Sequence, residues 1–254
     1  MCTVLLLLRP GEPWPLLLGA NRDERFDRPF RAPGRYWDDA PAVVAGLDVL
    51  GGGSWFGVND QGVVATIVNG VDRLGPLEGK ASRGELVLRA LGEHDARRAA
   101  FAIAALRPER YRGFTLLVAD RSSAFAVSSD ERTIRAGALP PGHHMVTPEG
   151  CDVVTSPRFE AHFSAFCAAP PPDPQRGDWQ SWTELLRHAD EDDPHRAMTV
   201  VTGTGFGTVC SSLLALSATP SDPAVLLFAN GQPTHAPYRL LTAPWARAAN
   251  VEPA

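Results

Sequence analysis

Two apolar runs joined by a turn open the chain: MCTVLLLLRPGEPWPLLLGANRDE, residues 1–24. The first run, Val4 to Leu8, predicts a buried strand, and the Arg-Pro-Gly-Glu-Pro segment after it is typical of a turn. The second run, Leu16 to Leu18, leads into a polar cluster at residues 21–24. A hairpin of this kind would bring the cluster back to the neighbourhood of Cys2.

Cys2 is a candidate nucleophile. Met1 is normally removed when the second residue is small, which would leave a thiol and a free α-amino group on Cys2. The thiolate is the reactive form, and a free thiol with a pKa near 8.5 is mostly protonated at neutral pH. An α-amino group with a pKa of about 7.7–8.0 can accept that proton. The alternative is that Cys2 is a small core residue, but packing does not require the four polar residues that follow the second strand.

Composition limits the class of protein. A chain of 254 residues with 44% hydrophobic and 21% charged residues is typical of a globular protein, and we expect one domain over residues 1–254. The net charge of -5 does not favour nucleic acid as a partner. The first apolar run is too short for a signal peptide or a membrane span. The four cysteines lack metal-ligand spacing, so we expect no metal and a reducing cytoplasm. Nothing in the sequence indicates an oligomeric state.

The rest of the chain alternates strand and helix patterns, which favours a layered α+β domain. We expect an irregular segment over 25–41, and weak order over 244–254. A capping box at Ser82–Glu85 would start the first helix. Further strands are predicted at 43–46, 55–59, 63–68, 114–119, 124–128, 133–136, 209–216 and 224–229, and further helices at 95–106, 157–168 and 178–189.

Three smaller motifs were weighed. Gly51-Gly52-Gly53 lacks the Lys-Ser/Thr of a phosphate loop, so these glycines are expected either to allow close approach of backbone or to form a bulge in a strand. His143-His144 would point to opposite faces of a strand, and no acidic or cysteine partner stands at ligand spacing, so we expect no metal there. Asn69, at the end of a predicted strand, either forms part of a turn or donates a hydrogen bond to an oxyanion.

The ordered string Met1-Cys2-Thr3, Ala20 to Glu24 and Arg28-Pro29 resembles the NRDE family, whose eukaryotic member is transport and Golgi organisation protein 2. Residues 51–59, 62–65 and Asn69 extend the resemblance, which is dense to about residue 70. This family in turn resembles the cysteine N-terminal nucleophile hydrolases. The resemblance implies a four-layer αββα sandwich with antiparallel sheets.

The same resemblance implies roles for single residues. Cys2 would attack an acyl carbonyl and Asn69 would stabilise the oxyanion. Asp23 would hold the α-ammonium group, and Arg22 would orient an anionic substrate group, with Asn21 and Glu24 completing the motif. Two positions depart from the pattern: Thr147-Pro148 stands where relatives carry Ser-Asn, and Val209 where many carry an arginine.

The implied function is a cysteine amidohydrolase that acts on a small acyl amide or thioester, through a non-peptide C–N bond in the amide case. The alternative is a carrier in haem or acyl-lipid trafficking, with haem held non-covalently by Cys2 or a histidine. A purely structural role in secretory organisation is not favoured by the composition.

Overall fold

The computed structural model describes residues 2–190 and 192–242. The predicted removal of Met1 and the predicted weak order of 244–254 lie outside these residues. The predicted hairpin is confirmed: β1 (Thr3–Leu8) pairs antiparallel with β2 (Leu16–Arg25), and Thr3 lies opposite Asn21. The polar cluster does not follow the second strand, however, because β2 continues through it to Arg25.

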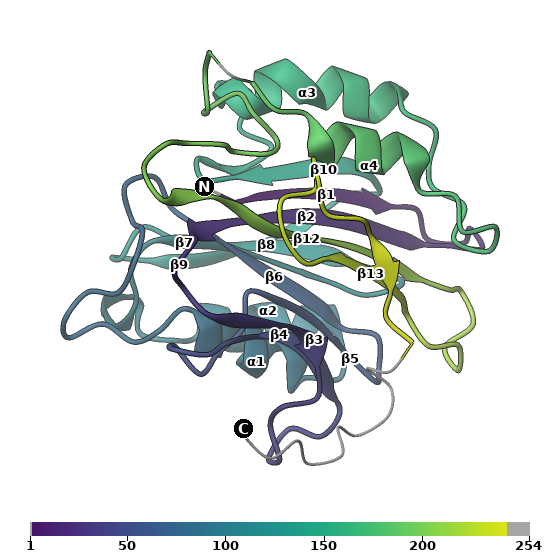
Figure 1. Cartoon of the computed structure of the whole chain (residues 1–254). Coiled ribbons are helices and arrows are strands. Elements are labelled where there is room, and N and C mark those ends of the chain that lie inside the picture. Colours follow the sequence, from purple (N-terminus) through teal and green to yellow (C-terminus); the bar gives the residue numbers. More distant parts are fainter. Residues whose placement is uncertain (1, 191, 243–254) are drawn as a thin grey trace, which may run out of the picture.

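The hairpin forms the centre of the first of two antiparallel sheets, in the order β11-β10-β1-β2-β12-β13-β14 (Figure 1). The remaining strands of this sheet are β10 (Gly142–Thr147), β11 (Gly150–Cys151), β12 (Phe206–Leu216), β13 (Val225–Ala229) and β14 (Arg239–Leu240). The long strand β12 pairs with the whole of β2, so the C-terminal part of the chain supports the N-terminal hairpin.

The second sheet runs in sequence order from β3 to β9. Its strands are β3 (Phe30–Gly34), β4 (Val43–Asp48), β5 (Phe56–Asn59), β6 (Val64–Asn69), β7 (Phe114–Ala119), β8 (Ala124–Ser129) and β9 (Ile134–Leu139). The prediction of irregular structure over 25–41 was therefore wrong in part, since β3 lies within it. Arg and Pro residues are tolerated there because β3 is an edge strand with one partner.

Helices cover the outer face of each sheet, which confirms the four-layer αββα sandwich (Figure 1). The helices are α1 (Gly84–Leu91), α2 (Ala96–Ala104), α3 (Pro157–Ala168) and α4 (Gln180–Arg187), with a short 3-10 helix at Pro108–Arg110. The pair α1 and α2 packs on the second sheet, and α3 and α4 pack on the first. Among the described residues, none of the helices has the length and apolar character needed to cross a membrane.

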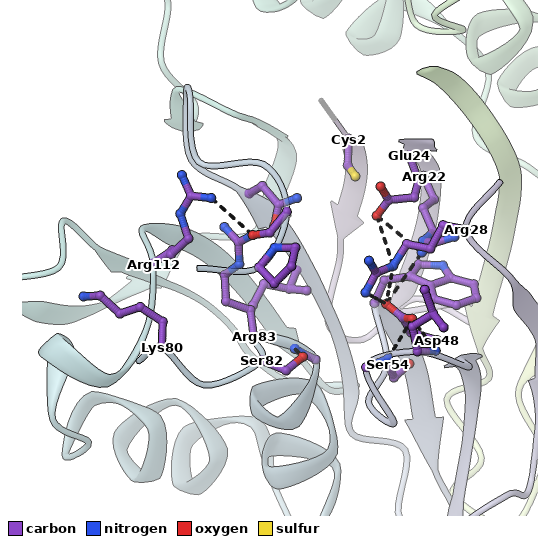
Figure 2. A pocket seen from close by; sticks show the side chains of 18 of the residues that line it. Cys2, Arg22, Glu24, Arg28, Asp48, Ser54, Lys80, Ser82, Arg83 and Arg112 are labelled. Atoms are coloured by element: carbon purple, nitrogen blue, oxygen red, sulfur yellow. Dashed lines mark hydrogen bonds and ion pairs between the residues drawn. The ribbon is translucent and has the colours of Figure 1, made fainter. Parts of the chain in front are cut away.

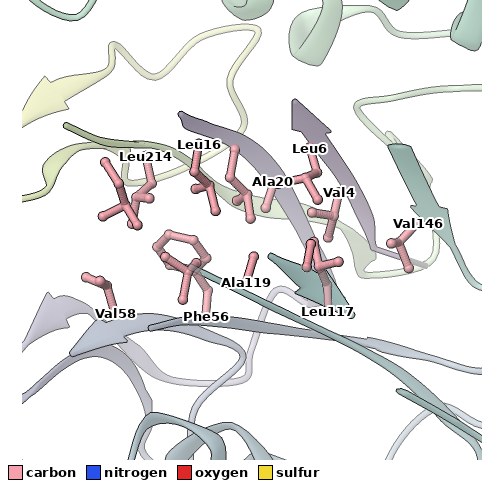
Figure 3. Close-up of a cluster of buried hydrophobic side chains, with 14 of the residues drawn as sticks. Val4, Leu6, Leu16, Ala20, Phe56, Val58, Leu117, Ala119, Val146 and Leu214 are labelled. Atoms are coloured by element: carbon pink, nitrogen blue, oxygen red, sulfur yellow. The ribbon is translucent and has the colours of Figure 1, made fainter. Parts of the chain in front are cut away.

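Side-chain alternation along β1 decides which way Cys2 faces. Val4 and Leu6 point into the core between the two sheets (Figure 3). Leu5 and Leu7 belong to the cluster that packs against α3 and α4. Because successive side chains of a strand point to opposite faces, Cys2 shares the face of Val4. The thiol therefore lies between the sheets, at the end of the central core.

The predicted capping box does not close at α1. Arg83 occupies the N-cap position, and the Glu85 carboxylate accepts a hydrogen bond from the Tyr111 hydroxyl instead of reaching back. At α2 the prediction holds, because the Asp95 side chain accepts a hydrogen bond from the Arg98 amide at 2.7 Å. A helix start read from sequence was right in both cases, but tertiary contacts decided which groups cap it.

The glycine run at 51–53 brings backbone segments together, as predicted. A Cβ atom on Gly53 would lie 2.5 Å from the carbonyl carbon of Gly84. The Ser54 amide also donates to the Gly84 carbonyl oxygen at 3.1 Å. This contact fixes the first turn of α1 against the turn between β4 and β5, beside the cavity described below.

Candidate functional site

A cavity of about 450 Å³ opens beside Cys2 (Figure 2). One wall carries Arg22, Glu24, Arg28 and Asp48, and the opposite wall carries Lys80, Arg83 and Arg112. Of the residues predicted from sequence, the cavity lining includes Cys2, Arg22, Asp23, Glu24 and Asn69. The fold thus gathers most of the predicted site around one space.

Strand alternation divides the polar cluster between two faces of the first sheet. Arg22 and Glu24 face the cavity between the sheets. Asn21 faces the helical layer, where its Nδ2 donates to the carbonyl oxygens of Leu186 at 2.9 Å and Met198 at 2.8 Å. These bonds tie β2 to the end of α4, so the amide of Asn21 serves the packing of the helical layer.

Asp23 borders the cavity, and its carboxylate is directed toward α3. Its Oδ1 accepts a hydrogen bond from the Thr208 hydroxyl at 2.6 Å, and its Oδ2 lies 3.7 Å from Nη1 of Arg158. Burial raises the pKa of the Asp23 carboxyl, and the charge of Arg158 and the bond from Thr208 oppose this rise. The main-chain carbonyl of Asp23 accepts a hydrogen bond from the Cys2 Sγ at 3.8 Å, so residues 2 and 23 are direct neighbours.

The Cys2 thiol is shielded from water, with 8% of the residue exposed. Burial raises the pKa of this thiol above its ordinary value. The neutral thiol is therefore the resting form near neutral pH, and a nucleophilic role requires a base next to the sulfur.

Arg22 is held by aromatic rings and carboxylates together. Its guanidinium lies 4.4 Å from the Trp55 ring centroid and 5.3 Å from that of Phe30. Its Nη2 lies 3.6 Å from Glu24 and 3.8 Å from Asp48. Nη1 is buried and has no hydrogen-bond partner within residues 2–190 and 192–242. This N–H group is free to donate to a ligand in the cavity.

The Trp55 ring has room beside the neighbouring strand β4 only because residue 46 is a glycine. A Cβ atom at Gly46 would lie 2.4 Å from the Trp55 ring. The Trp55 ring therefore packs against Gly46 and supports the Arg22 guanidinium. The sequence offered Trp55 only as part of the family resemblance and offered no sign of its contact with Arg22.

Arg158 is a deeply buried charged residue near the site and was not singled out from sequence. It lies in the first turn of α3 with 2% of the residue exposed. Its Nη1 donates to the Thr3 hydroxyl at 2.5 Å, and its Nη2 donates to the Pro194 carbonyl at 3.2 Å. The sequence does contain a signal for this role, because Arg158 lies on the same face of the predicted helix as several aromatic residues.

Asn69 ends β6 and is half-buried at the edge of the cavity, opposite Phe114 in the strand pairing. Its predicted oxyanion role stays a prediction. Four basic residues of the lining, Arg28, Lys80, Arg83 and Arg112, were also missed. The sequence predicts Ser82 to Glu85 only as the start of a helix, yet Ser82, Arg83 and Gly84 also form part of the cavity wall.

The two departures from the family pattern lie in apolar or hairpin settings. Val209 stands at a bulge in β12 and packs with Phe228, Phe30 and Trp55, next to the Arg22 stack. Thr147 is buried at the end of β10, in the short hairpin with β11. Neither residue is part of the cavity lining.

The prediction that His144 lacks acidic and cysteine neighbours was wrong, because the turn after β10 brings Cys151 and Asp152 back beside it. The Nδ1 atom lies 2.6 Å from the Asp152 carboxylate and Nε2 lies 2.7 Å from the Pro140 carbonyl. Both neighbours are acceptors, so both ring nitrogens donate when the ring is protonated, and that form has no lone pair for a metal. The histidine instead joins β10 to the turn.

Replacing His144 with glutamine is expected to destabilise the fold by roughly 1 kcal/mol, a figure reduced for the partial exposure of Asp152. Burial by itself would lower the pKa of His144, but the bonds to Asp152 and Pro140 raise it, and the same contact lowers the pKa of Asp152. The histidine contributes stability below about pH 6.5 that is lost as pH rises through its folded pKa. The Asp152 carboxylate contributes stability above about pH 4, which is lost as pH falls through its folded pKa.

Urea unfolding of wild type and His144→Gln at pH 5.5 and pH 8.5 measures this effect. The difference between the two proteins should be larger at pH 5.5. An equal difference at both values would show that folding does not raise the pKa of the imidazole, and a smaller difference at pH 5.5 would show that folding lowers it.

Solved structures define the fold class. The structure resembles the N-acylethanolamine-hydrolyzing acid amidase ortholog of Caenorhabditis elegans, with a TM-score of 0.53 and 12% identity, over 94% of this chain and 100% of that one. It also resembles the C2A variant of the conjugated bile acid hydrolase of Clostridium perfringens, with a TM-score of 0.51 and 11% identity over 100% of both chains. Penicillin V acylase of Agrobacterium tumefaciens matches with a TM-score of 0.50 and 12% identity, over 96% of this chain and 98% of that one. The chain therefore has the N-terminal nucleophile hydrolase fold.

The family follows from sequence. Residues 1–218 match the model of the transport and Golgi organisation 2 family, and the chain belongs to that family. The transport and Golgi organization protein 2 homolog of Bos taurus is 31% identical over 131 residues, which cover 48% of this chain and 46% of the relative. The Homo sapiens homolog is 30% identical over 132 residues, covering 49% and 47%. The match thus spans about half the length of these relatives.

Proposed function

We propose that the chain is a cysteine hydrolase that cleaves a small acyl amide or thioester through Cys2 after removal of Met1. The observation that carries the proposal is the position of the Cys2 thiol at the end of a cavity that also contains the Arg22 guanidinium and Asn69. The fold supports it, because three proteins of similar fold are named as an amidase, a hydrolase and an acylase.

The proposed reaction begins with transfer of the thiol proton to the α-amino group of Cys2. The thiolate sulfur then attacks the acyl carbonyl, and the C–S bond forms as the carbonyl oxygen becomes an oxyanion. Collapse of this intermediate breaks the bond to the leaving amine or thiol, which takes the proton from the α-ammonium group. Water then hydrolyses the acyl thioester, releasing the carboxylic acid and restoring the thiol.

The neighbouring groups support these steps. Contact between the Cys2 thiol and the Asp23 carbonyl brings the Asp23 residue close to the proposed base. The unpaired Nη1 of Arg22 offers a donor to the acyl group or to its substituent. Asn69 borders the same cavity and is proposed to donate its amide to the oxyanion.

A carrier role is the second candidate, and the raised pKa of the Cys2 thiol favours it. A protonated thiol in a basic cavity suits binding without turnover. Of the two kinds of haem ligand considered from sequence, the cavity lining within the described chain offers one thiol and no imidazole. Haem binding that survives Cys2→Ala, measured from the Soret band, would contradict axial ligation by Cys2.

Intact-mass spectrometry separates the two candidates. The protein is measured before and after a thiol-directed acylating probe, in wild type, Cys2→Ala and Cys167→Ser. The last variant removes an exposed cysteine outside the cavity and controls for unspecific labelling. Loss of Met1 with rapid labelling confined to Cys2 supports the hydrolase. Retained Met1, or labelling of Cys2 no faster than of Cys151 and Cys210, overturns it.

Replacing Asn69 with alanine is expected to lower turnover by about 10²–10³-fold with little change in KM, because an oxyanion donor acts in the transition state. The measurement is steady-state kinetics on a thioester that wild type cleaves. Asn59→Ala is not a suitable control because its amide is buried against α1. Asn230, an exposed asparagine after β13, provides the control through Asn230→Ala. Equal kcat values for wild type and Asn69→Ala would remove Asn69 from the mechanism.

A further inference from the structure

The charges that line the cavity do not cancel on one of its walls. The lining contains five basic residues and three acidic ones: Arg22, Arg28, Lys80, Arg83, Arg112, and Asp23, Glu24, Asp48. Arg22 and Arg28 are paired with Glu24 and Asp48. Lys80 is paired with Glu131, which lies outside the lining, at 3.1 Å. The uncompensated charge therefore belongs to Arg83 and Arg112.

These two arginines are held by backbone carbonyls. Arg83 donates to the carbonyl oxygens of Gly113 at 3.0 Å and Gly75 at 3.3 Å. Arg112 donates to the same Gly75 carbonyl at 3.2 Å and to that of Asp72 at 3.2 Å, and also to that of Leu74. Over the described ranges, neither guanidinium has a carboxylate oxygen within 4 Å, the limit for an ion pair. The shared Gly75 carbonyl keeps the two positive charges side by side.

This arrangement costs free energy in the absence of an anion. Burial, and after it the charge of Arg112, lower the pKa of Arg83 to about 10. The Nε atom of Arg112 is buried without a hydrogen-bond partner in the part of the chain that the structure describes. The first turn of α1, with Ser82 and Gly84, lies on the same wall and adds the positive end of a helix dipole. An anion placed here would relieve the repulsion between the two guanidinium groups.

We propose that Arg83 and Arg112 form a subsite for a carboxylate or phosphate group of the ligand whose acyl carbon reaches Cys2. This inference rests on the proposed function for the position of the acyl group. Two guanidinium groups recognise a planar carboxylate or a phosphate through paired N–H donors. Figure 2 shows the Cys2 sulfur between this wall and the Arg22 wall, so a ligand can meet both. The ligand is accordingly an acyl compound with an anionic group remote from the scissile bond.

Calorimetric titration of the full chain with Cys2→Ala tests the subsite without turnover. The probes are octanoate, octyl phosphate and octanamide, which each have eight carbon atoms and differ in the charge of the head group. We expect the tighter-binding anion to bind at least about tenfold more tightly than octanamide at low ionic strength. Arg83→Gln with Arg112→Gln should remove this preference and leave octanamide binding unchanged. The tighter of the two anions identifies carboxylate or phosphate as the natural group.

Two further variants make the result decisive. Arg107→Gln with Arg132→Gln removes the same charge from exposed positions outside the cavity and should retain the preference. Arg83→Lys with Arg112→Lys keeps the charge, and it should retain a preference for anions even if the glutamine pair does not fold. Equal binding of all three probes to the Cys2→Ala chain, or equal affinity in the glutamine pair and the exposed control, overturns the subsite. Absence of hydrolysis in the wild-type chain, together with an intact anion preference in Cys2→Ala, would instead count against the hydrolase alone.

Discussion

Replacing Cys2 with alanine is expected to lower the turnover of acyl amides and thioesters by at least about a thousandfold. The sulfur would be the atom that forms the covalent intermediate, and removal of a nucleophile costs more than removal of any group that assists it. Steady-state kinetics on a panel of short-chain acyl p-nitroanilides and acyl thioesters measures the loss. The release of p-nitroaniline or free thiol provides the signal.

Two controls define what the loss means. Cys167→Ala removes an exposed thiol outside the cavity and should keep wild-type turnover. Cys2→Ser keeps the shape of the side chain with a less acidic nucleophile, and it should fall between wild type and alanine. If Cys2→Ala retains the wild-type rate on every substrate that wild type cleaves, Cys2 is not the nucleophile and the carrier role is favoured.

Replacing Arg158 with methionine is expected to destabilise the fold by about 3–5 kcal/mol. Arg158 donates to Thr3 and to the Pro194 carbonyl, and its charge lies 3.7 Å from the Asp23 carboxylate, whose side chain has no exposed surface. Removing one member of a buried ion pair leaves the other in a poorly solvating environment. Urea unfolding followed by circular dichroism measures the change in the free energy of unfolding.

A double-mutant cycle with Asp23→Asn tests the physical reason. If the loss comes from the buried pair, Arg158→Met should cost less in the Asp23→Asn background than in wild type. Arg196→Met is the matched control, because Arg196 lies next to the same helix but is 43% exposed and 3.9 Å from Glu160. The Arg196→Met substitution should lower the free energy of unfolding by less than about 1 kcal/mol. Equal losses at positions 158 and 196 would contradict the role of burial.

Local patterns in the sequence were sufficient for the secondary structure around Cys2. The apolar runs and the turn between them predicted the hairpin, and its register places residue 3 opposite residue 21 as expected. The error concerned Asn21 to Glu24, which were expected beyond the strand. Polar residues continue β2 because β12 pairs with it along its whole length and because each polar side chain finds a partner. Neither condition is visible in residues 1–24.

The two-residue period of a strand also explains why the polar cluster was only partly assigned. Alternation by itself sends Arg22 and Glu24 to one face and Asn21 and Asp23 to the other. Which face meets the second sheet and which meets the helices depends on the packing of layers. As a result of that packing, the Asn21 side chain donates a hydrogen bond to a carbonyl of α4, and the Arg22 guanidinium lies on the Trp55 ring.

The sequence by itself determined the family, the four-layer fold and the position of Cys2 at the end of a core strand. The resemblance of residues 1–70 to the NRDE family carried the family and the four-layer fold, whereas local periodicity carried the position of Cys2, because a hairpin forms between near neighbours in the chain. Only the tertiary structure decided the surroundings of the thiol: Arg158 beneath Asp23, Trp55 beneath Arg22, and the pair Arg83 and Arg112. These residues lie tens of residues or more from their partners, and their charges acquire a role only when folding removes them from water and fixes which carboxylates they can reach.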